Sequence, residues 1–272
     1  MAQNSLPQDL IKASNTLSII IPAKNEEKAI GDIITSIKLC LSEYNYEIVV
    51  VDDGSNDRTK DIALGANINV ISHIKTMGKG VAMKTGVDNS IGDIIVFLDG
   101  DGAHNPVDIP TVITPIQQQK ADLVIGSRFL PGSVVTHFPI RRWFSNIIAS
   151  SAISVIISAL LPAAMFINRL IFPRRSVTHR RRSPAGTKRW ITDCTSGFRA
   201  ITRDNWHRLP LIAQGFEIET EMIFEAAKNR IVITEVPIHC SWNSDLSHLS
   251  ILRDGLKTLI LVTKKLMDTT WT

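Results

Sequence analysis

The sequence predicts an α/β fold with a mostly parallel central sheet flanked by helices. Short apolar runs alternate with segments whose apolar residues recur at helical spacing, a pattern typical of parallel sheets with right-handed crossovers. Two of the apolar runs end in aspartate clusters, and ligands of open α/β sheets bind beyond the carboxyl ends of the strands. A chain of 272 residues is also long enough to bury one substantial core.

The first strand is expected at residues 17–21, where an apolar run ends at Pro22. Isoleucine and leucine at helical spacing predict an amphipathic helix over residues 26–42. The same patterns predict strands at 48–51, 69–72, 94–98, 123–125, 197–202 and 231–236. They predict further helices at 57–64, 79–89, 107–119, 218–228 and 247–267.

We expect the chain to divide into an N-terminal tail (1–16), one α/β domain (17–242) and a C-terminal amphipathic helix (243–272). Residues 1–16 are polar and show no secretory signal. The cysteines are odd in number and lack metal-binding spacing, which predicts reduced thiols and favours the cytoplasm. They are Cys40, Cys194 and Cys240.

An insertion at residues 140–190 combines apolar and basic sequence. Residues 147–167 carry no charge, so they could form helices on a membrane surface, a spanning helix or a buried pair of helices; serines, a proline and basic flanks favour the first. Residues 123–192 contain eleven basic and no acidic residues, whereas the rest of the chain has a balance of −7. Such a segment needs an anionic partner; an anionic membrane surface is expected rather than nucleic acid, because few aromatic residues are interleaved.

The aspartate clusters follow the predicted strands at 48–51 and 94–98. Asp52 and Asp53 end the first strand, and Asp99 and Asp101 end the second. Carboxylates in such positions face a sugar hydroxyl or a metal ion, and an Asp-x-Asp pair suits a hard divalent cation already held by a diphosphate. The pattern therefore indicates a nucleotide-sugar site; turn formation alone is the alternative for Asp52, Asp53 and Ser55.

Six motifs occur together in a fixed order: 20–27 (IIPAKNEE), 51–59 (VDDGSNDRT), 78–82 (GKGVA), 98–102 (LDGDG), 126–128 (GSR) and 193–199 (DCTSGFR). Over about residues 17–265, the chain resembles the family 2 inverting glycosyltransferases with a GT-A fold. The branch it resembles most is that of the dolichyl-phosphate mannose or glucose synthases and their archaeal and bacterial relatives.

The resemblance implies a donor site. Asp101 would ligate Mg²⁺ or Mn²⁺, and Asp99 would bond the ribose or the metal. Asp53 would bind the base or ribose while Asp52 fixes its turn. The other residues implied in donor binding are Pro22, Ala23, Asn25, Glu26, Lys79, Gly100 and Ser196. The alternatives are that Asn25 and Glu26 only cap the following helix and that Lys79 is a solvated lysine.

The resemblance also implies an acceptor site. Arg128 and Arg199 would hold the acceptor phosphate and the donor diphosphate. Asp193 is either a general base for a hydroxyl acceptor or, with an already ionised phosphate acceptor, a residue that orients Arg199 or the acceptor loop.

Two residues depart from the family pattern. Ala103 stands where close relatives often carry an amide that helps to hold the metal, so water or His104 would have to complete the coordination. His248 stands where lysine is common, and the charge of a histidine depends on pH.

The sequence therefore predicts an enzyme that transfers a hexose from a nucleotide-diphosphate sugar to a polyprenyl or dolichyl phosphate at the cytoplasmic face of the membrane. The alternatives are a family 2 enzyme with a soluble or lipid-linked saccharide acceptor, a nucleotidyltransferase, and a non-catalytic binding module. The nucleotidyltransferase would need a glycine-rich basic loop after the first strand, and PAKNE at 22–26 is not one.

Overall fold

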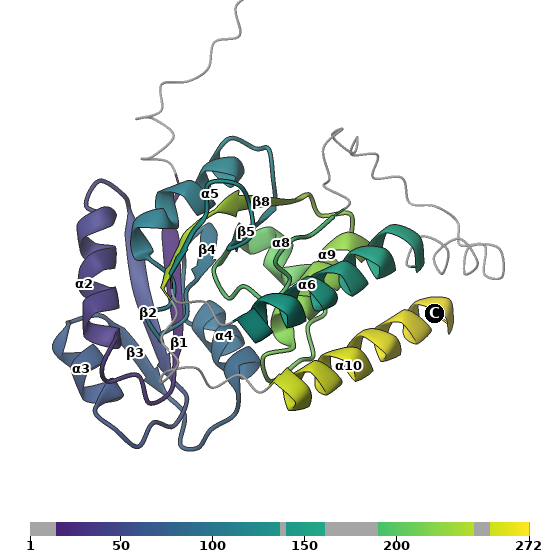
Figure 1. The fold of residues 1–272 in the computed structure, drawn as a ribbon. Helices are drawn as coiled ribbons and strands as arrows, with labels where there is room; N and C mark the ends of the chain where they lie inside the picture. Colours follow the sequence, from purple (N-terminus) through teal and green to yellow (C-terminus); the bar gives the residue numbers. More distant parts are fainter. Residues whose placement is uncertain (1–14, 137–139, 161–189, 242–250, 272) are drawn as a thin grey trace, which may run out of the picture.

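A seven-stranded sheet forms the centre of the molecule (Figure 1). The computed structural model describes residues 15–136, 140–160, 190–241 and 251–271. The strands stand in the order β3-β2-β1-β4-β7-β5-β8. Their bounds are β1 (Leu17–Ala23), β2 (Tyr46–Asp52), β3 (Asn69–Ser72), β4 (Ile94–Phe97), β5 (Leu123–Ser127), β7 (Arg199–Thr202) and β8 (Ile233–Pro237).

The prediction of a mostly parallel sheet is confirmed. Strand β1 pairs in parallel with β2 and β4, and β5 pairs in parallel with β8. Strand β7 is the exception, because it lies antiparallel between β4 and β5. A small parallel sheet of β6 (Val134–Thr136) and β9 (His239–Ser241) was not predicted; each of its strands has only three residues.

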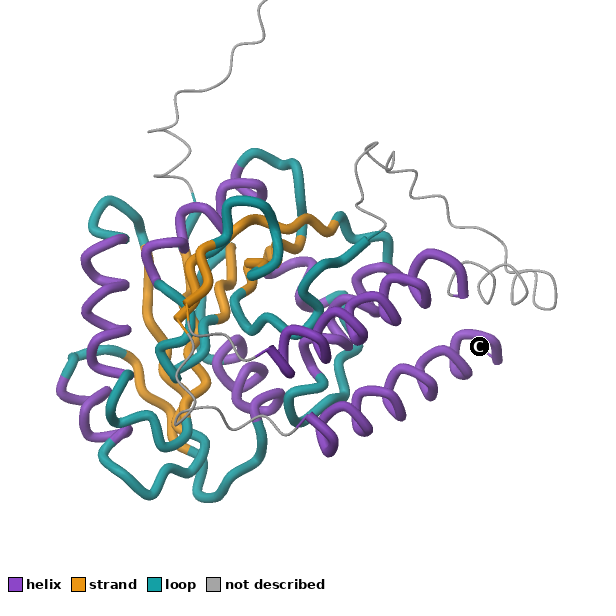
Figure 2. Tube along the Cα trace, viewed as in Figure 1, coloured by secondary structure: helices purple, strands orange, loops and turns teal. Residues whose placement is uncertain are grey.

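Helices cover both faces of the sheet (Figure 2). They are α2 (Ile30–Cys40), α3 (Thr59–Gly65), α4 (Lys79–Asp88), α5 (Ile109–Gln117), α6 (Ile140–Val155), α8 (Arg203–His207), α9 (Ile218–Lys228) and α10 (Ile251–Trp271). The helix predicted at 107–119 begins as the short 3-10 helix η1 (Pro106–Asp108), and the helix predicted from residue 26 begins only at Ile30.

The core has two main layers, one on each face of the sheet. Strand β1 shows why: Ile19 and Ile21 pack on one side with α2 and α5, whereas Ile20 packs on the other side with α4 and α9. Successive residues of a strand point to opposite faces. The second layer also receives Ile153 from α6 and Val262 from α10.

The described part of the predicted insertion is α6 followed by the π-helix η2 (Ile156–Leu160). The basic run at 169–189 and His248 lie outside the described residues. Within residues that the structure describes, no helix has the length and apolar character needed to cross a bilayer. The three cysteines are free, as predicted; Cys194 and Cys240 are buried, and Cys40 is partly buried.

Helix α10 is fastened to α9 by a buried lysine. The Lys265 Nζ lies 2.8 Å from Glu221 Oε1 and 2.8 Å from Glu225 Oε1, and it donates to the carbonyl of Pro210. Both glutamates are almost fully buried. Burial of an acid is costly unless it is paired, so the C-terminal helix contributes charge that α9 needs.

We expect Lys265→Met to destabilise the protein by roughly 3 kcal/mol, because it leaves two buried carboxylates without their cation. Urea unfolding followed by circular dichroism measures this free energy. Lys264→Met is the matched control, since Lys264 is the exposed neighbour on the same helix. Equal decreases in the free energy of unfolding of the two variants would contradict the view that Lys265 stabilises the packing of α10 on α9.

Candidate active site

Two acidic residues follow β4 and define the centre of the site. The Asp99 Oδ1 lies 2.6 Å from Lys79 Nζ, and Lys79 Nζ lies 2.5 Å from Glu219 Oε1. The Lys79 side chain is only 12% exposed, so the alternative of a solvated lysine is wrong. The three residues form a charge network that joins β4, α4 and α9.

The glycines around Lys79 bring α4 against the loop before α9. Gly78 has a φ of 102°, which favours glycine. The amides of Gly80 and Val81 donate to the carbonyl of Gln214 at 2.7 and 3.3 Å. The start of α4 is therefore bonded to the loop before α9.

Asp101 lies in a different electrostatic environment from Asp99. Burial and the neighbouring charge of Asp99 raise the pKa of Asp101 to about 6. Burial raises the pKa of Asp99 too, but the charges of Lys79, His104 and Arg128 outweigh it, so the pKa of Asp99 is lowered overall. The amide of Ala103 donates to Asp101 Oδ1 at 2.9 Å. A divalent cation would supply the positive charge that Asp101 lacks, so the pair fits a metal ion.

The described residues do not supply a third protein ligand. Ala103 has no donor atom, and His104 packs its ring against Phe198, with the ring centroids 5.7 Å apart. Burial lowers the pKa of His104 to about 4. Among the residues described, no three His, Cys, Asp or Glu side chains converge on one point. Oxygens of a bound diphosphate and water are left to complete the coordination.

The turn after β1 lies directly against the turn after β4. A Cβ atom on Gly100 would lie 3.2 Å from the Ala23 Cβ and 3.3 Å from the Pro22 carbonyl oxygen. Burial raises the pKa of Glu26 to about 8, with Asp101 and Asp99 adding to the effect. These expected donor residues therefore gather beside the aspartate pair.

The side chains of Asn25 and Glu26 do not cap α2, because the N-cap of α2 is Ala29 and no side chain bonds there. Instead, Asn25 has a φ of 57° and its Oδ1 accepts from the amide of Asn56 at 2.8 Å. The Glu26 amide donates to Thr59 Oγ1 at 2.7 Å. Both residues tie the β1 turn to the β2 turn.

Asp52 and Asp53 both organise backbone. Asp52 accepts from the Ser55 amide, as expected for a residue that fixes its turn. The Asp53 carboxylate accepts from the amides of Met77 and Gly78, each at 2.8 Å, and its Oδ1 lies 2.7 Å from His73 Nδ1. The contacts that Asp53 makes hold the loop leading to Lys79, whereas the sequence suggested a base or ribose partner.

Arg128 and Asp193 form a two-point ion pair at the end of β5. Arg128 Nε donates to Asp193 Oδ2 and Nη2 donates to Asp193 Oδ1, each at 2.7 Å. Arg128 Nη2 also donates to Thr195 Oγ1 at 2.9 Å. Asp193 itself has no exposed surface. The arginine that Asp193 orients is thus Arg128, where the sequence suggested Arg199.

The expectation that Arg199 points to a phosphate is wrong in this structure. Arg199 has no exposed surface, and its three nitrogens donate to the carbonyls of Ser196, Glu219 and Cys194. Ser196 is buried as well. Arg199 is the first residue of the central strand β7, and its buried side chain joins the 194–196 segment to α9.

Sequence reasoning missed two carboxylates that support the site. Glu219 holds Lys79, and Glu235 accepts from the amides of Thr192 and Asp193 and from the Thr192 hydroxyl, at 2.9–3.0 Å. Only the structure shows that residues 218–226 of α9 are all buried, although three of them are glutamates. Acids on a fully buried helix must have charged or donor partners.

Comparisons with known proteins identify the family of the chain. Residues 18–208 match the family described as Glycosyl transferase family 2. The chain is 30% identical over 241 residues to an uncharacterized protein of Methanocaldococcus jannaschii, covering 87% of this chain and 85% of that one. It is 31% identical over 225 residues to a dolichol-phosphate mannosyltransferase of Pyrococcus furiosus, covering 81% of this chain but only 55% of that protein.

A solved structure shows the same fold. Glucosyl-3-phosphoglycerate synthase of Mycobacterium tuberculosis, in complex with Mn²⁺ and uridine-diphosphate-glucose, superimposes with a TM-score of 0.63 at 23% identity. The match covers 93% of this chain and 81% of that one. The predicted GT-A fold is confirmed, and the chain belongs to glycosyl transferase family 2.

Proposed function

We propose that this glycosyltransferase moves a hexose from a nucleotide-diphosphate sugar, of the GDP-mannose or UDP-glucose type, to a polyprenyl or dolichyl phosphate. An acceptor phosphate oxygen attacks the anomeric carbon in line. The bond from that carbon to the diphosphate oxygen breaks, the configuration inverts, and the nucleoside diphosphate leaves with the electron pair.

The single observation that carries the proposal is the position of Asp193. A general base for a hydroxyl acceptor must reach the proton that it removes. Asp193 is fully buried, and both of its oxygens bond to Arg128. A phosphate monoester is mostly ionised near neutral pH and needs no base. An arginine fixed in this way favours a phosphate acceptor over a hydroxyl acceptor.

The donor side rests on the two aspartates. Asp99 and Asp101 would hold Mg²⁺ or Mn²⁺, and the bound ion supplies positive charge to the departing diphosphate. Lys79 neutralises Asp99, and Gly100, between the two aspartates, packs against Pro22 and Ala23 at the end of β1. The name of the solved relative, a complex with Mn²⁺ and uridine-diphosphate-glucose, supports this assignment.

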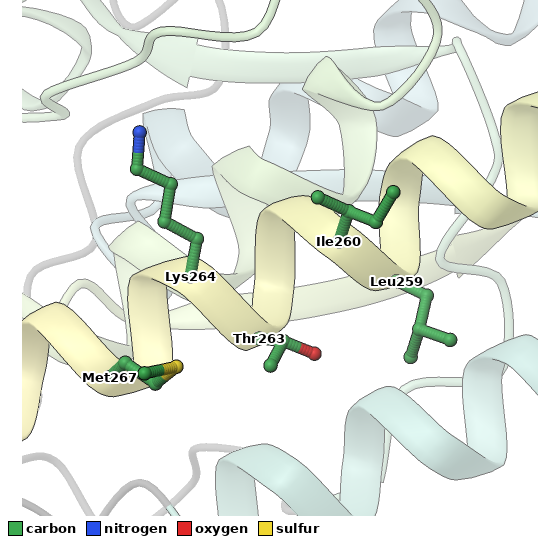
Figure 3. Close-up of a pocket in the computed structure, with 5 residues that line it drawn as sticks. All are labelled: Leu259, Ile260, Thr263, Lys264 and Met267. Atoms are coloured by element: carbon green, nitrogen blue, oxygen red, sulfur yellow. The ribbon is translucent and has the colours of Figure 1, made fainter.

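The membrane side rests on an exposed apolar face of α10. A pocket there is lined by Leu259, Ile260, Thr263, Lys264 and Met267. Figure 3 shows these side chains on successive turns of the helix. Leu259, Ile260 and Met267 are 58–61% exposed, and Lys257 and Lys264 lie exposed on the same helix. Apolar and basic side chains together suit the interface of an anionic bilayer, so we place the enzyme at the cytoplasmic membrane face.

The curated relative also supports a lipid-phosphate acceptor, since it is named a dolichol-phosphate mannosyltransferase. Helix α6 adds to the apolar surface, because Ile148 and Val155 are 69% and 48% exposed. We propose that α6 and α10 receive the prenyl chain while Arg128 receives its phosphate.

Purified protein in detergent, given nucleotide sugars, Mn²⁺ and a polyprenyl phosphate, should form a glycosyl-phospholipid that mass spectrometry identifies. EDTA should abolish the product, and Asp101→Asn should lower the rate at least about 100-fold, because the developing charge loses its stabilisation. Asp88→Asn, an exposed acid at the end of α4, is the control. Transfer to 3-phosphoglycerate but never to a lipid phosphate would overturn the proposed acceptor.

Binding of Mn²⁺ should weaken as the pH falls below about 6. A proton competes with the metal for Asp101, whose pKa is about 6 without the ion. Titration calorimetry with the uridine or guanosine diphosphate present, between pH 5 and 8, measures the affinity. In Asp101→Asn the affinity should be low and nearly independent of pH over this range. An unchanged affinity in the wild-type protein between pH 5 and 7 would contradict Asp101 as a ligand.

The double variant Leu259→Ser/Ile260→Ser should bind anionic vesicles about 10-fold more weakly, because each replaced side chain no longer buries apolar surface in the interface. Vesicle flotation measures the bound fraction. Leu39→Ser removes a residue that is 74% exposed on α2, away from α10, and should leave binding unchanged. Equal binding by the double variant and wild type would remove α10 from the membrane contact.

A further inference from the structure

Helix α6 meets the rest of the protein through a row of polar side chains as well as through Ile153, which packs in the core. Asn146, Ser150 and Ser154 follow one another at intervals of four residues, so they share one helix face. They are 4%, 3% and 0% exposed, respectively. Helices at the surface of globular proteins usually bury their apolar face. A row of buried polar contacts is therefore unusual for a helix such as α6.

Each residue of this buried polar face, defined as Asn146, Ser150 and Ser154, bonds to the segment 191–195. Ser154 Oγ accepts from the Ile191 amide at 2.9 Å, and Ser150 Oγ accepts from the Cys194 amide at 3.0 Å. Those two contacts end on backbone. Asn146 differs, because its Oδ1 accepts from the hydroxyl of Thr195 at 2.6 Å.

The Asn146 contact continues to Arg128. A threonine hydroxyl has one proton to donate and lone pairs to accept with. Asn146 Oδ1 takes the proton, so the lone pairs of Thr195 face Arg128 Nη2, which donates at 2.9 Å. The Asn146 amide group is itself oriented, because its Nδ2 donates to the carbonyl of Thr192 at 3.3 Å.

Thr195 is exposed, so its hydroxyl needs Asn146 to hold it in this orientation. Without Asn146, its hydroxyl can turn toward water or toward Asp193 Oδ1, which lies 3.5 Å away. In either case, the acceptor that faces Arg128 Nη2 is no longer held. The guanidinium would then lose an acceptor that is held in place.

We infer that Asn146 is a positioning residue: through Thr195 it holds the Arg128 guanidinium in the orientation that receives the acceptor phosphate. The role of Arg128 rests on the proposed function, whereas the hydrogen-bond chain from α6 to Arg128 is a property of the structure. The inference also makes α6, whose outer face carries exposed apolar residues, a support of the acceptor site.

The kinetic test compares variants with and without the chain. Asn146→Leu and Thr195→Val should each lower kcat/KM for polyprenyl phosphate about 5-fold, the range of one hydrogen bond. The KM for the nucleotide sugar should stay within about 2-fold. Thr195→Ser keeps the hydroxyl and should restore most of the loss. The double variant should have a kcat/KM no lower than that of the less active single variant, because both substitutions break the same hydrogen-bond chain.

Ser154→Ala is the matched control. It removes a hydrogen bond between the same helix and the same segment but does not touch the path to Arg128. It should leave kcat/KM nearly unchanged even where it lowers the melting temperature. Equal kinetic losses in Ser154→Ala and Asn146→Leu would show that α6 has only a structural role, and the inference would fall.

A second measurement does not depend on activity. The Nε–H of Arg128, identified by its loss in Arg128→Lys, should exchange with solvent several-fold faster in Asn146→Leu and Thr195→Val than in wild type, Thr195→Ser and Ser154→Ala. Proton exchange by nuclear magnetic resonance reads this directly. Unchanged exchange in the first two variants overturns the inference. If wild type glycosylates no lipid phosphate, the proposed function fails and the exchange rates alone decide about Asn146.

Discussion

The ion pair between Arg128 and Asp193 is the interaction on which the rest of the site depends. It joins the end of β5 to the segment before β7, and neither partner can leave without stranding a charge in the protein. Glu235 supports the pair by accepting hydrogen bonds from the amides of Thr192 and Asp193. Helix α6 supports it through Asn146 and Thr195. The arginine thus has one defined position before any substrate arrives, which lowers the cost of ordering it at each turnover.

Charge is distributed unevenly between the two halves of the site. On the donor side, Lys79 is shared by Asp99 and Glu219, so acids outnumber bases there. On the acceptor side, Arg128 is matched by Asp193. Asp101 lies in this acidic half, and burial together with the charge of Asp99 raises its pKa to about 6. The proposed metal ion would supply positive charge beside Asp101.

The sequence predicted the elements whose pattern is local. The strand at 69–72 and the helix at 218–228 were found to the residue, and the aspartate pair was placed at its strand end. It failed for Arg199, because a motif shows order along the chain but not the side of the sheet to which an antiparallel strand delivers a side chain. Glu235 and Thr195 were missed because their partners lie 42–67 residues away. Long-range polar partners leave no periodic trace in one sequence.

The buried polar contacts of α6 also limit how this protein can be shortened. Deleting residues 140–190 to obtain a variant that is soluble without detergent would remove an exposed apolar surface. It would also take away the acceptors of the Ile191 and Cys194 amides, which lie two residues before Asp193 and one after it. A deletion that improves solubility would therefore also disorder the segment around Asp193. Replacing the outward-facing isoleucines singly, with the serines and Asn146 retained, would improve solubility without that loss.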